Sequence, residues 1–214
     1  MAISNFEGCY VGAKLTKGEK TRQRLMDAAE RLFAERGWRN TSLRDIAAEA
    51  DIREPGIYNH FSGKESLYHE VLIRALQPLA DAISETLASD LSENDLVGLP
   101  AKLTELLSEH PSMPALFHQA LSSSSDDMGQ QVMEVWLQRL FAQGESLWRA
   151  VNSNDSGDRR RITLRMVLMF NAVTGYFLSQ KVLDQAGLGH VLDKANLEEQ
   201  QNLLSSVMRT FVRS

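Results

Sequence analysis

Residues 51–66 read DIREPGIYNHFSGKES, and they place a proline and a glycine where the surrounding pattern predicts a short helix. Proline is tolerated in the first turn of a helix, because its missing N–H would have no partner there anyway. The residue before a proline resists the helical conformation. Pro55 therefore predicts that a helix begins near residues 53–55 and ends around Phe61.

The flanking residues predict three further helices. Gly37 supplies a left-handed stop for the preceding helix. Ser42 with Asp45, and Ser62 with Glu65, have the spacing of capping boxes, which predicts a short second helix before the quoted stretch and a longer fourth helix after it. The first helix has an apolar face with i, i+3, i+4 spacing, made by Leu25, Ala28, Ala29, Leu32 and Phe33.

The rest of the chain also has helical spacing, without strand-like alternation or internal repeats. The fold class predicted is all-α, with an N-terminal three-helix helix-turn-helix domain and a larger C-terminal helical domain. Pro78 predicts a bend in the helix that joins them, because it leaves the carbonyl of Arg74 without its helical partner. The further helices are expected near 80–90, 99–109, 113–122, 127–152, 158–185 and 197–212.

Composition indicates a soluble cytoplasmic protein. The chain has 214 residues, and its 43% hydrophobic and 24% charged content is ordinary for a globular protein. Cys9 is the only cysteine, which excludes an intrachain disulfide and favours a reducing compartment. The N-terminal residues hold no apolar run of signal-peptide length. The most apolar long stretch, 162–178, is interrupted by Arg165 and Asn171, so no membrane span is expected.

The net charge of −5 is unevenly distributed. Residues 1–72 carry 11 basic and 11 acidic side chains, whereas residues 73–214 carry 12 and 17. A locally basic edge on an acidic protein can still face phosphate groups. Each basic residue near the start of the first helix is better explained as a solvated helix start. These residues are Lys17, Lys20, Arg22 and Arg24.

Two short helices joined by a tight turn, the second with polar side chains at its start, have helix-turn-helix geometry. Ile57 and Phe61, four residues apart, can anchor the inner face of the second helix. Tyr58 and Asn59 then point outward. Lys64 lies in the first turn of the next helix, where the helix dipole disfavours a cation unless a phosphate binds there too.

The segment TRQRLMDAAERLFAERGWRNTSLRDIAAEADIREPGIYNHFSGKESLYHEVL resembles the DNA-binding domain of the tetracycline-repressor (TetR) family of bacterial regulators. The resemblance covers roughly residues 18–72. Many separated positions agree at fixed spacing. They are the Ala28-Ala29 and Leu32-Phe33 pairs, Gly37 with Trp38, Thr41, Ile46-Ala47, residues 57–61, Lys64-Glu65 and Leu67.

The resemblance implies a ligand-responsive transcriptional regulator, a repressor that a small molecule releases from a palindromic operator in double-stranded DNA. Thr41 and Tyr58 would contact phosphates, and Lys64 would bind a phosphate at the start of the fourth helix. The residues expected at the DNA interface are Thr41, Ser42, Arg44, Arg53, Glu54, Tyr58, Asn59, His60 and Lys64. Among them, Arg44, Arg53, Glu54 and Asn59 are the candidates for base edges.

Four positions depart from the family pattern and put the operator sequence in doubt. Asp51 stands at a turn position often held by glycine, and it tolerates a left-handed conformation. Arg53 replaces a small helix cap. Gly56 stands where threonine or alanine is common, so a groove contact is lost. Glu54 is unusual near phosphates, although a carboxylate can accept a hydrogen bond from cytosine N4.

The resemblance also implies three segments and a homodimer. The segments are a flexible tail (1–17), the DNA-binding domain (18–78) and a ligand-binding and dimerisation domain (79–214). We expect the dimer to form through the helices near 158–185 and 197–212. The last of these has an apolar stripe that favours pairing with a second copy, made by Leu197, Leu204, Val207, Met208, Phe211 and Val212.

Bulky apolar residues with a few polar neighbours predict an internal pocket for a largely apolar effector. Each of them taken alone is better explained as core packing. The candidate lining residues are Met113, Phe117, His118, Leu121, Met133, Trp136, Leu137, Leu140, Phe170, Asn171, Thr174 and Phe177.

The sequence predicts no cofactor, no metal site and no catalytic residue. The histidines lack ligand spacing, and the serine run at 122–125 has no base placed for it. Two alternatives stay open: a helical dimeric adaptor that does not bind DNA, and an enzyme built on a helical bundle.

Overall fold

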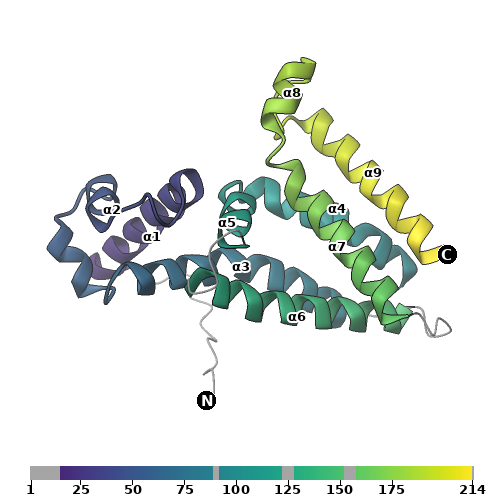
Figure 1. Ribbon diagram of the computed structural model, residues 1–214, viewed down its shortest axis with the longest axis horizontal. Coiled ribbons are helices and arrows are strands. Elements are labelled where there is room, and N and C mark those ends of the chain that lie inside the picture. The colour runs from purple at the N-terminus through teal and green to yellow at the C-terminus, as the bar shows by residue number, and fades with distance from the viewer. Residues whose placement is uncertain (1–14, 89–91, 122–127, 152–157, 214) are drawn as a thin grey trace.

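A computed structural model of the chain describes residues 15–88, 92–121, 128–151 and 158–213, and within these ranges all regular structure is helical (Figure 1). The predicted all-α class is confirmed. Of the predicted N-terminal tail, residues 1–14 lie outside the described residues, and the first helix already begins at Lys17.

The first two helices follow local capping signals. Helix α1 (Lys17–Arg36) begins with a capping box between Thr16 and Glu19 and ends at Gly37, whose φ is 79°. Helix α2 (Leu43–Glu49) begins with the predicted box, in which the Ser42 hydroxyl accepts from the Asp45 N–H while Asp45 bonds back to Ser42. Their buried faces pack together as the sequence pattern predicts.

The third element is a 3₁₀-helix, η1 (Glu54–Asn59), which begins where Pro55 predicts a helix and ends two residues before Phe61. The Gly56 N–H donates to the Arg53 carbonyl at 2.8 Å, and the His60 N–H donates to the Ile57 carbonyl at 2.8 Å. Both bonds join residues three apart, which is the 3₁₀ pattern. Six residues that include a proline and a glycine cannot hold an α-helix on propensity alone.

Helix α3 (Lys64–Ala88) passes through Pro78 without ending, so the helix expected at 80–90 is a continuation of it. Leu79 and Ile83 are buried and extend the apolar face of the first half, and this packing compensates for the backbone bond lost at the proline. Just before Pro78, Arg74 bridges to α1, with its guanidinium 2.7 Å from Asp27 and 2.6 Å from Glu30.

Among the remaining helices, α6 lies beside the second half of α3, and α4, α7 and α9 lie beyond it, whereas α8 lies at the far end of α7 (Figure 1). The expected helix at 99–109 begins at residue 93, where a Ser92–Asp95 capping box starts it ahead of Pro100. The helix expected at 158–185 is two helices. The helices after α3 are α4 (Glu93–Glu109), α5 (Ser112–Leu121), α6 (Met128–Val151), α7 (Arg159–Tyr176), α8 (Gln180–Ala186) and α9 (Lys194–Arg213).

The apolar residues of α9 divide between two faces. Leu204 and Met208 are buried and belong to the core, on a helix that packs mainly against α4. Phe211 and Val212 pack against the same core. Of the predicted dimerisation stripe, Val207 is exposed, and Leu203, which the stripe did not include, is exposed beside it. Most of the stripe thus faces the core of its own chain, because the sequence does not show which neighbour covers which side.

Across the described ranges, no single helix is both long and apolar enough to cross a membrane. The pair α7 and α8 reaches the required length and composition only when taken together, and the two helices meet at 64°.

Candidate functional site

The start of α2 and the whole of η1 form one polar surface. Ile57 and Phe61 are buried beneath it, at 0% and 3% exposure, and anchor η1 to the core. The side chains that point to solvent from this surface are Ser42, Arg44, Arg53, Glu54, Tyr58 and Asn59, and His60 is half-buried beside them. The structure thus brings together most of the predicted interface residues.

Asp45 braces the start of this surface. Its carboxylate accepts hydrogen bonds from the Ser42 hydroxyl at 2.6 Å and from the Ser42 N–H at 3.0 Å. These bonds favour the charged form and lower the pKa of the Asp45 carboxyl. The Ser42 hydroxyl is therefore committed to capping, and what it offers to a ligand is limited to its remaining acceptor capacity.

Thr41 does not belong to the exposed surface. Its side chain is 1% exposed, and its hydroxyl lies 2.9 Å from the Gly37 carbonyl oxygen and 3.2 Å from that of Leu32. In this structure the Thr41 hydroxyl is therefore not accessible to solvent, where the expected phosphate would have to lie. The physical reason is that the end of α1 leaves unpaired carbonyls, and Thr41 satisfies them.

Lys64 lies at the first residue of α3, with its ammonium 4.2 Å from the ring centroid of Trp38. Trp38 in turn lies against Tyr68 and Phe33, at centroid distances of 4.8 Å and 5.8 Å. The Trp38 ring thus holds the Lys64 ammonium by a cation–π contact. A cation therefore lies at the start of a helix, an arrangement that suits an anion.

Arg24 stabilises the turn between α2 and η1, a role that the sequence pattern did not predict. Arg24 donates to the Ala50 carbonyl, and its guanidinium lies 3.4 Å from the Asp51 carboxylate. Asp51 has a φ of 51°, the left-handed conformation predicted for it. Arg22 is also held, because it pairs with Glu70 and lies over the Phe61 ring. Arg22 and Arg24 thus make specific contacts within the protein, which the expectation of a solvated helix start did not include.

A second candidate site is a cavity of about 110 Å³ lined by residues of α3, α4, α6, α7 and α9. Its walls are almost wholly apolar, and the polar exceptions are Arg165 and Thr174. The lining residues contributed by α3 and α4 are Leu79, Ile83, Leu96, Leu99, Pro100, Leu103 and Leu107. Those from the later helices are Leu140, Phe141, Gly144, Leu147, Trp148, Arg165, Met166, Met169, Phe170, Val173, Thr174 and Met208.

Three of the predicted lining residues, Leu140, Phe170 and Thr174, lie on this cavity. The other predicted lining residues lie outside this cavity. Leu121 and Leu137 line a more open neighbouring cavity. His118 approaches Thr174 from behind the wall, at 3.5 Å, and the Asn171 amide donates to its own helix at Val167. The rest pack elsewhere in or against the core: Met113, Phe117, Met133, Trp136 and Phe177.

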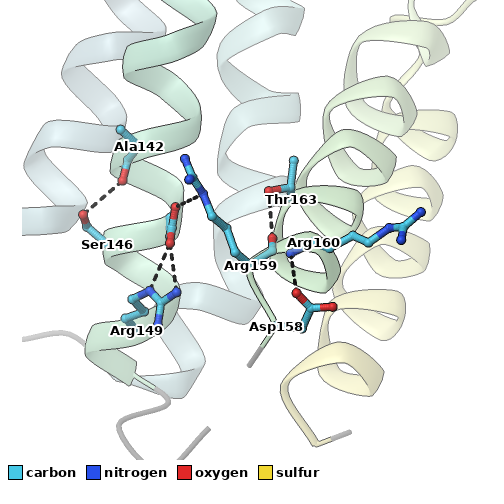
Figure 2. Close-up of polar contacts among 8 residues, drawn as sticks. Ala142, Ser146, Arg149, Asp158, Arg159, Arg160 and Thr163 are labelled. Carbon is cyan, nitrogen blue, oxygen red and sulfur yellow. Dashed lines mark hydrogen bonds and ion pairs between the residues drawn. The ribbon is translucent and has the colours of Figure 1, made fainter. Parts of the chain in front are cut away.

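The neighbouring cavity, of about 570 Å³, lies between α6 and α7, and Phe141 separates it from the apolar cavity. Its polar side includes Glu145, which accepts hydrogen bonds from Arg149 at 2.9 Å and 3.1 Å and lies 3.4 Å from Arg159 (Figure 2). This network ties the start of α7 to α6. Among the described residues, no group of three histidine, cysteine or acidic side chains could hold a metal ion.

Together, the fold and these sites define a helix-turn-helix protein whose later helices line an apolar cavity. The sequence model of the bacterial regulatory proteins of the tetR family matches residues 25–71. The helix-turn-helix segment of the chain belongs to this TetR family.

Similarity to known members extends beyond the matched segment. The chain is 33% identical over 140 residues to the transcriptional repressor KstR2 of Rhodococcus jostii, covering 64% of this chain and 66% of that protein. It is 32% identical over 124 residues to the repressor DhaR of a Mycobacterium species, covering 57% and 60%. The matched regions are thus just under two thirds of each relative's length.

A solved structure supports the fold over nearly the whole chain. The ketosteroid transcriptional regulator KstR2 of Mycobacterium tuberculosis superimposes with a TM-score of 0.71 and 20% identity. The superposition covers 93% of this chain and 96% of that one.

Proposed function

We propose that this protein is a ligand-responsive repressor of transcription that binds a palindromic DNA operator as a homodimer. The observation that carries the proposal is the exposed polar surface of α2 and η1, with Lys64 beside it at the start of α3. The Tyr58 side chain on this surface is 58% accessible although it belongs to a folded helix pair.

The chemistry of this surface fits a DNA half-site. Tyr58 and Lys64 are suited to phosphates, which position a protein but carry no sequence information. Arg44, Arg53, Glu54 and Asn59 can reach base edges in the major groove, where each base pair has a distinct pattern of donors and acceptors. The Ser42 and His60 side chains complete the rim. Thr41 acts behind this surface, by holding the loop that positions α2.

A palindromic operator requires two copies of the surface, about 34–36 Å apart, so that each lies in a successive major groove. We propose that the second copy binds through exposed apolar side chains on adjacent helices. On α7 these are Leu164, Val167 and Leu168, and on α9 they are Leu203 and Val207. A self-complementary apolar face of this kind suits a two-fold dimer.

The repressor assignment follows the relatives, since both matched proteins are named transcriptional repressors. We further propose that the apolar cavity takes the small molecule that releases the operator. The protein would act in the cytoplasm, as a regulator and not as an enzyme. Its acidic C-terminal part would limit unspecific attraction to DNA and leave binding to the N-terminal surface.

Fluorescence anisotropy tests the proposal with labelled fragments of the DNA upstream of the protein's own gene. Specific binding should survive excess unrelated DNA, and a footprint should show two half-sites related by a dyad. An adaptor that does not bind DNA, or an enzyme, predicts equal and weak retention of every fragment. Absence of any specific fragment across a genomic library would refute the proposal.

A further inference from the structure

The polar groups in the wall of the apolar cavity are already engaged within the protein. Among the described residues that line it, only Arg165 and Thr174 carry a polar side-chain group at the cavity apart from the indole of Trp148, and none is acidic. The Thr174 hydroxyl donates to the Phe170 carbonyl at 2.8 Å, and the residue is 1% exposed. The Arg165 guanidinium lies over the rings of Trp148 and Phe211, at 5.0 Å and 5.3 Å from their centroids.

A charged ligand would lose more than it gains in such a cavity. An ion that leaves water for apolar surroundings needs a partner that offsets its desolvation. A cation would meet Arg165 and no carboxylate among the described lining residues. An anion would find its one cationic partner in a guanidinium that already serves contacts within the wall. The wall therefore favours a ligand without charge.

The volume of the cavity and the side chains around it indicate the size of the ligand. The cavity is about 110 Å³. An apolar cavity of about 150 Å³ in another protein stays dry and binds benzene. Met166, Met169 and Met208 line the cavity together with Phe141 and Phe170. Methionine is flexible and makes favourable contacts with aromatic rings, so this wall can adapt to a ring slightly larger than the empty space.

A close contact between α6 and α7 limits this space. Gly144 on α6 and Met166 on α7 both line the cavity, and a Cβ added at residue 144 would collide with the terminal methyl group of Met166. The Met166 sulfur lies 3.0 Å from the same point. The glycine thus lets the end of the methionine lie against the backbone of α6. A side chain at residue 144 would displace that end, and the cavity is the adjoining space.

We infer that the cavity takes an uncharged, apolar molecule about the size of one ring, and that the contact between Gly144 and Met166 sets the upper limit of its size. This inference rests on the proposed effector role of the cavity and adds the chemical class of the ligand. Single-ring hydrocarbons and their uncharged derivatives belong to this class. Ring carboxylates and ring amines that are ionised at neutral pH do not.

Calorimetry on the full chain without DNA tests the class of ligand. Toluene, benzoate and benzylammonium share one ring and differ in charge. Toluene should bind at least about 100-fold more tightly than either ion, because burial in the apolar wall leaves the charge without compensation. Triisopropylbenzene has more apolar surface than toluene but needs far more room. It should therefore bind at least about tenfold more weakly than toluene.

Two glycine substitutions assign the binding to this cavity. Gly144→Ala should weaken toluene binding at least about tenfold, because the displaced end of Met166 takes up part of the space. Gly98→Ala on α4 is the matched control, since a Cβ added there meets no other atom within 4 Å, and it should leave the affinity unchanged. Both variants should keep the wild-type helical circular dichroism, because alanine is a better helix former than glycine.

A double variant tests the role of the methionine. Adding Met166→Ala to Gly144→Ala removes the side chain that the new methyl group displaces, so toluene binding should return to at least the wild-type affinity. If the double variant does not fold, Gly144→Ala, its control and the ligand series on the wild-type protein still decide.

The outcomes separate this inference from the proposed function. If benzoate or benzylammonium binds as tightly as toluene, or if triisopropylbenzene binds more tightly, the inference is wrong while the effector role of the cavity stands. If toluene does not bind, or if Gly144→Ala binds it as well as the wild-type protein does, the inference is also wrong. Operator binding, measured separately, decides the proposed function.

Discussion

The side-chain amide of Gln119 on α5 donates a hydrogen bond to the backbone carbonyl of Ala34 on α1, at 2.8 Å. The same side chain lies against Gly37, where a larger residue would collide with it. The preceding residue, His118, approaches Thr174 at 3.5 Å, and Thr174 lines the apolar cavity. Two consecutive residues of α5 thus contact the cavity wall and the N-terminal helices.

Replacing Gln119 by methionine should weaken the coupling between cavity and operator. Methionine keeps the length of the side chain but cannot donate to Ala34, so movement of α5 would no longer pull on α1. We expect operator affinity and ligand affinity each to change little, while the factor by which ligand weakens DNA binding falls several-fold. Titrating the operator with and without a saturating concentration of an effector found to release it measures this factor. Gln131→Met, on the exposed side of α6, is the control.

Thr41→Val should lower stability without a direct effect on DNA binding. Valine has the same shape, but it leaves the Gly37 and Leu32 carbonyls without the buried hydroxyl that now donates to them. We expect a loss of about 1–3 kcal/mol in the free energy of unfolding, measured by urea denaturation. Thr210→Val, exposed on α9, should change it by no more than about 0.5 kcal/mol. Weaker operator binding at unchanged stability would show instead that Thr41 contacts phosphate.

Local signals explain what the sequence could predict. The Ser42–Asp45 box, the glycine stop at residue 37 and the left-handed turn at Asp51 each depend on residues within a few positions of one another. Such signals can be evaluated from the sequence alone, because they do not depend on the fold. The all-α class and the exposed face of η1 follow from the same kind of periodicity.

The rest depends on contacts between distant segments. Thr41 and Arg24 look like surface residues until the end of α1 and the turn after α2 are brought against them. Seven of the nineteen residues that line the cavity come from α3 and α4, where residues such as Ile83 and Leu103 have the spacing of ordinary core. Periodicity shows that a face is apolar, but not whether another helix or a cavity lies opposite it.

Lys64→Ala should weaken binding to operator and to unrelated DNA by similar factors, because every sequence has phosphates. A dimer loses two such contacts, so the slope of log affinity against log salt should fall by about two units. Anisotropy titrations at several salt concentrations measure the slope. Lys181→Ala, exposed on α8, should leave it unchanged. An altered base preference with an unchanged slope would contradict the assignment of Lys64 to phosphate.

Asn59→Ala should weaken DNA binding in a different way from Lys64→Ala. Asn59 has no charge and is exposed on η1, where its amide can pair with adenine N6 and N7. We expect a cost of about 1–3 kcal/mol per base pair read, confined to one position in each half-site, with the salt slope nearly unchanged. Operators altered at each position in turn locate the effect. Equal loss on every altered operator would show that Asn59 does not read a base.

Leu203→Glu should dissociate the proposed dimer. Leu203 is 55% exposed on the face of α9 that does not pack against the core, and a carboxylate there would have to lose its water when a second copy binds. Val135 on α6 is 52% exposed but lies outside the proposed interface, so Val135→Glu is a matched control. Sedimentation velocity over a range of concentrations should show the dissociation constant of the dimer raised by at least about 100-fold, or about 2.7 kcal/mol, for Leu203→Glu alone.

Both variants should keep the wild-type helical circular dichroism, because neither position is buried in a single chain. Leu204→Glu would not be informative, since Leu204 belongs to the core of its own chain and its loss would unfold the helix before it tested the interface. If Leu203→Glu remains a dimer while Val135→Glu becomes a monomer, the second copy binds at α6 and the proposed face is wrong.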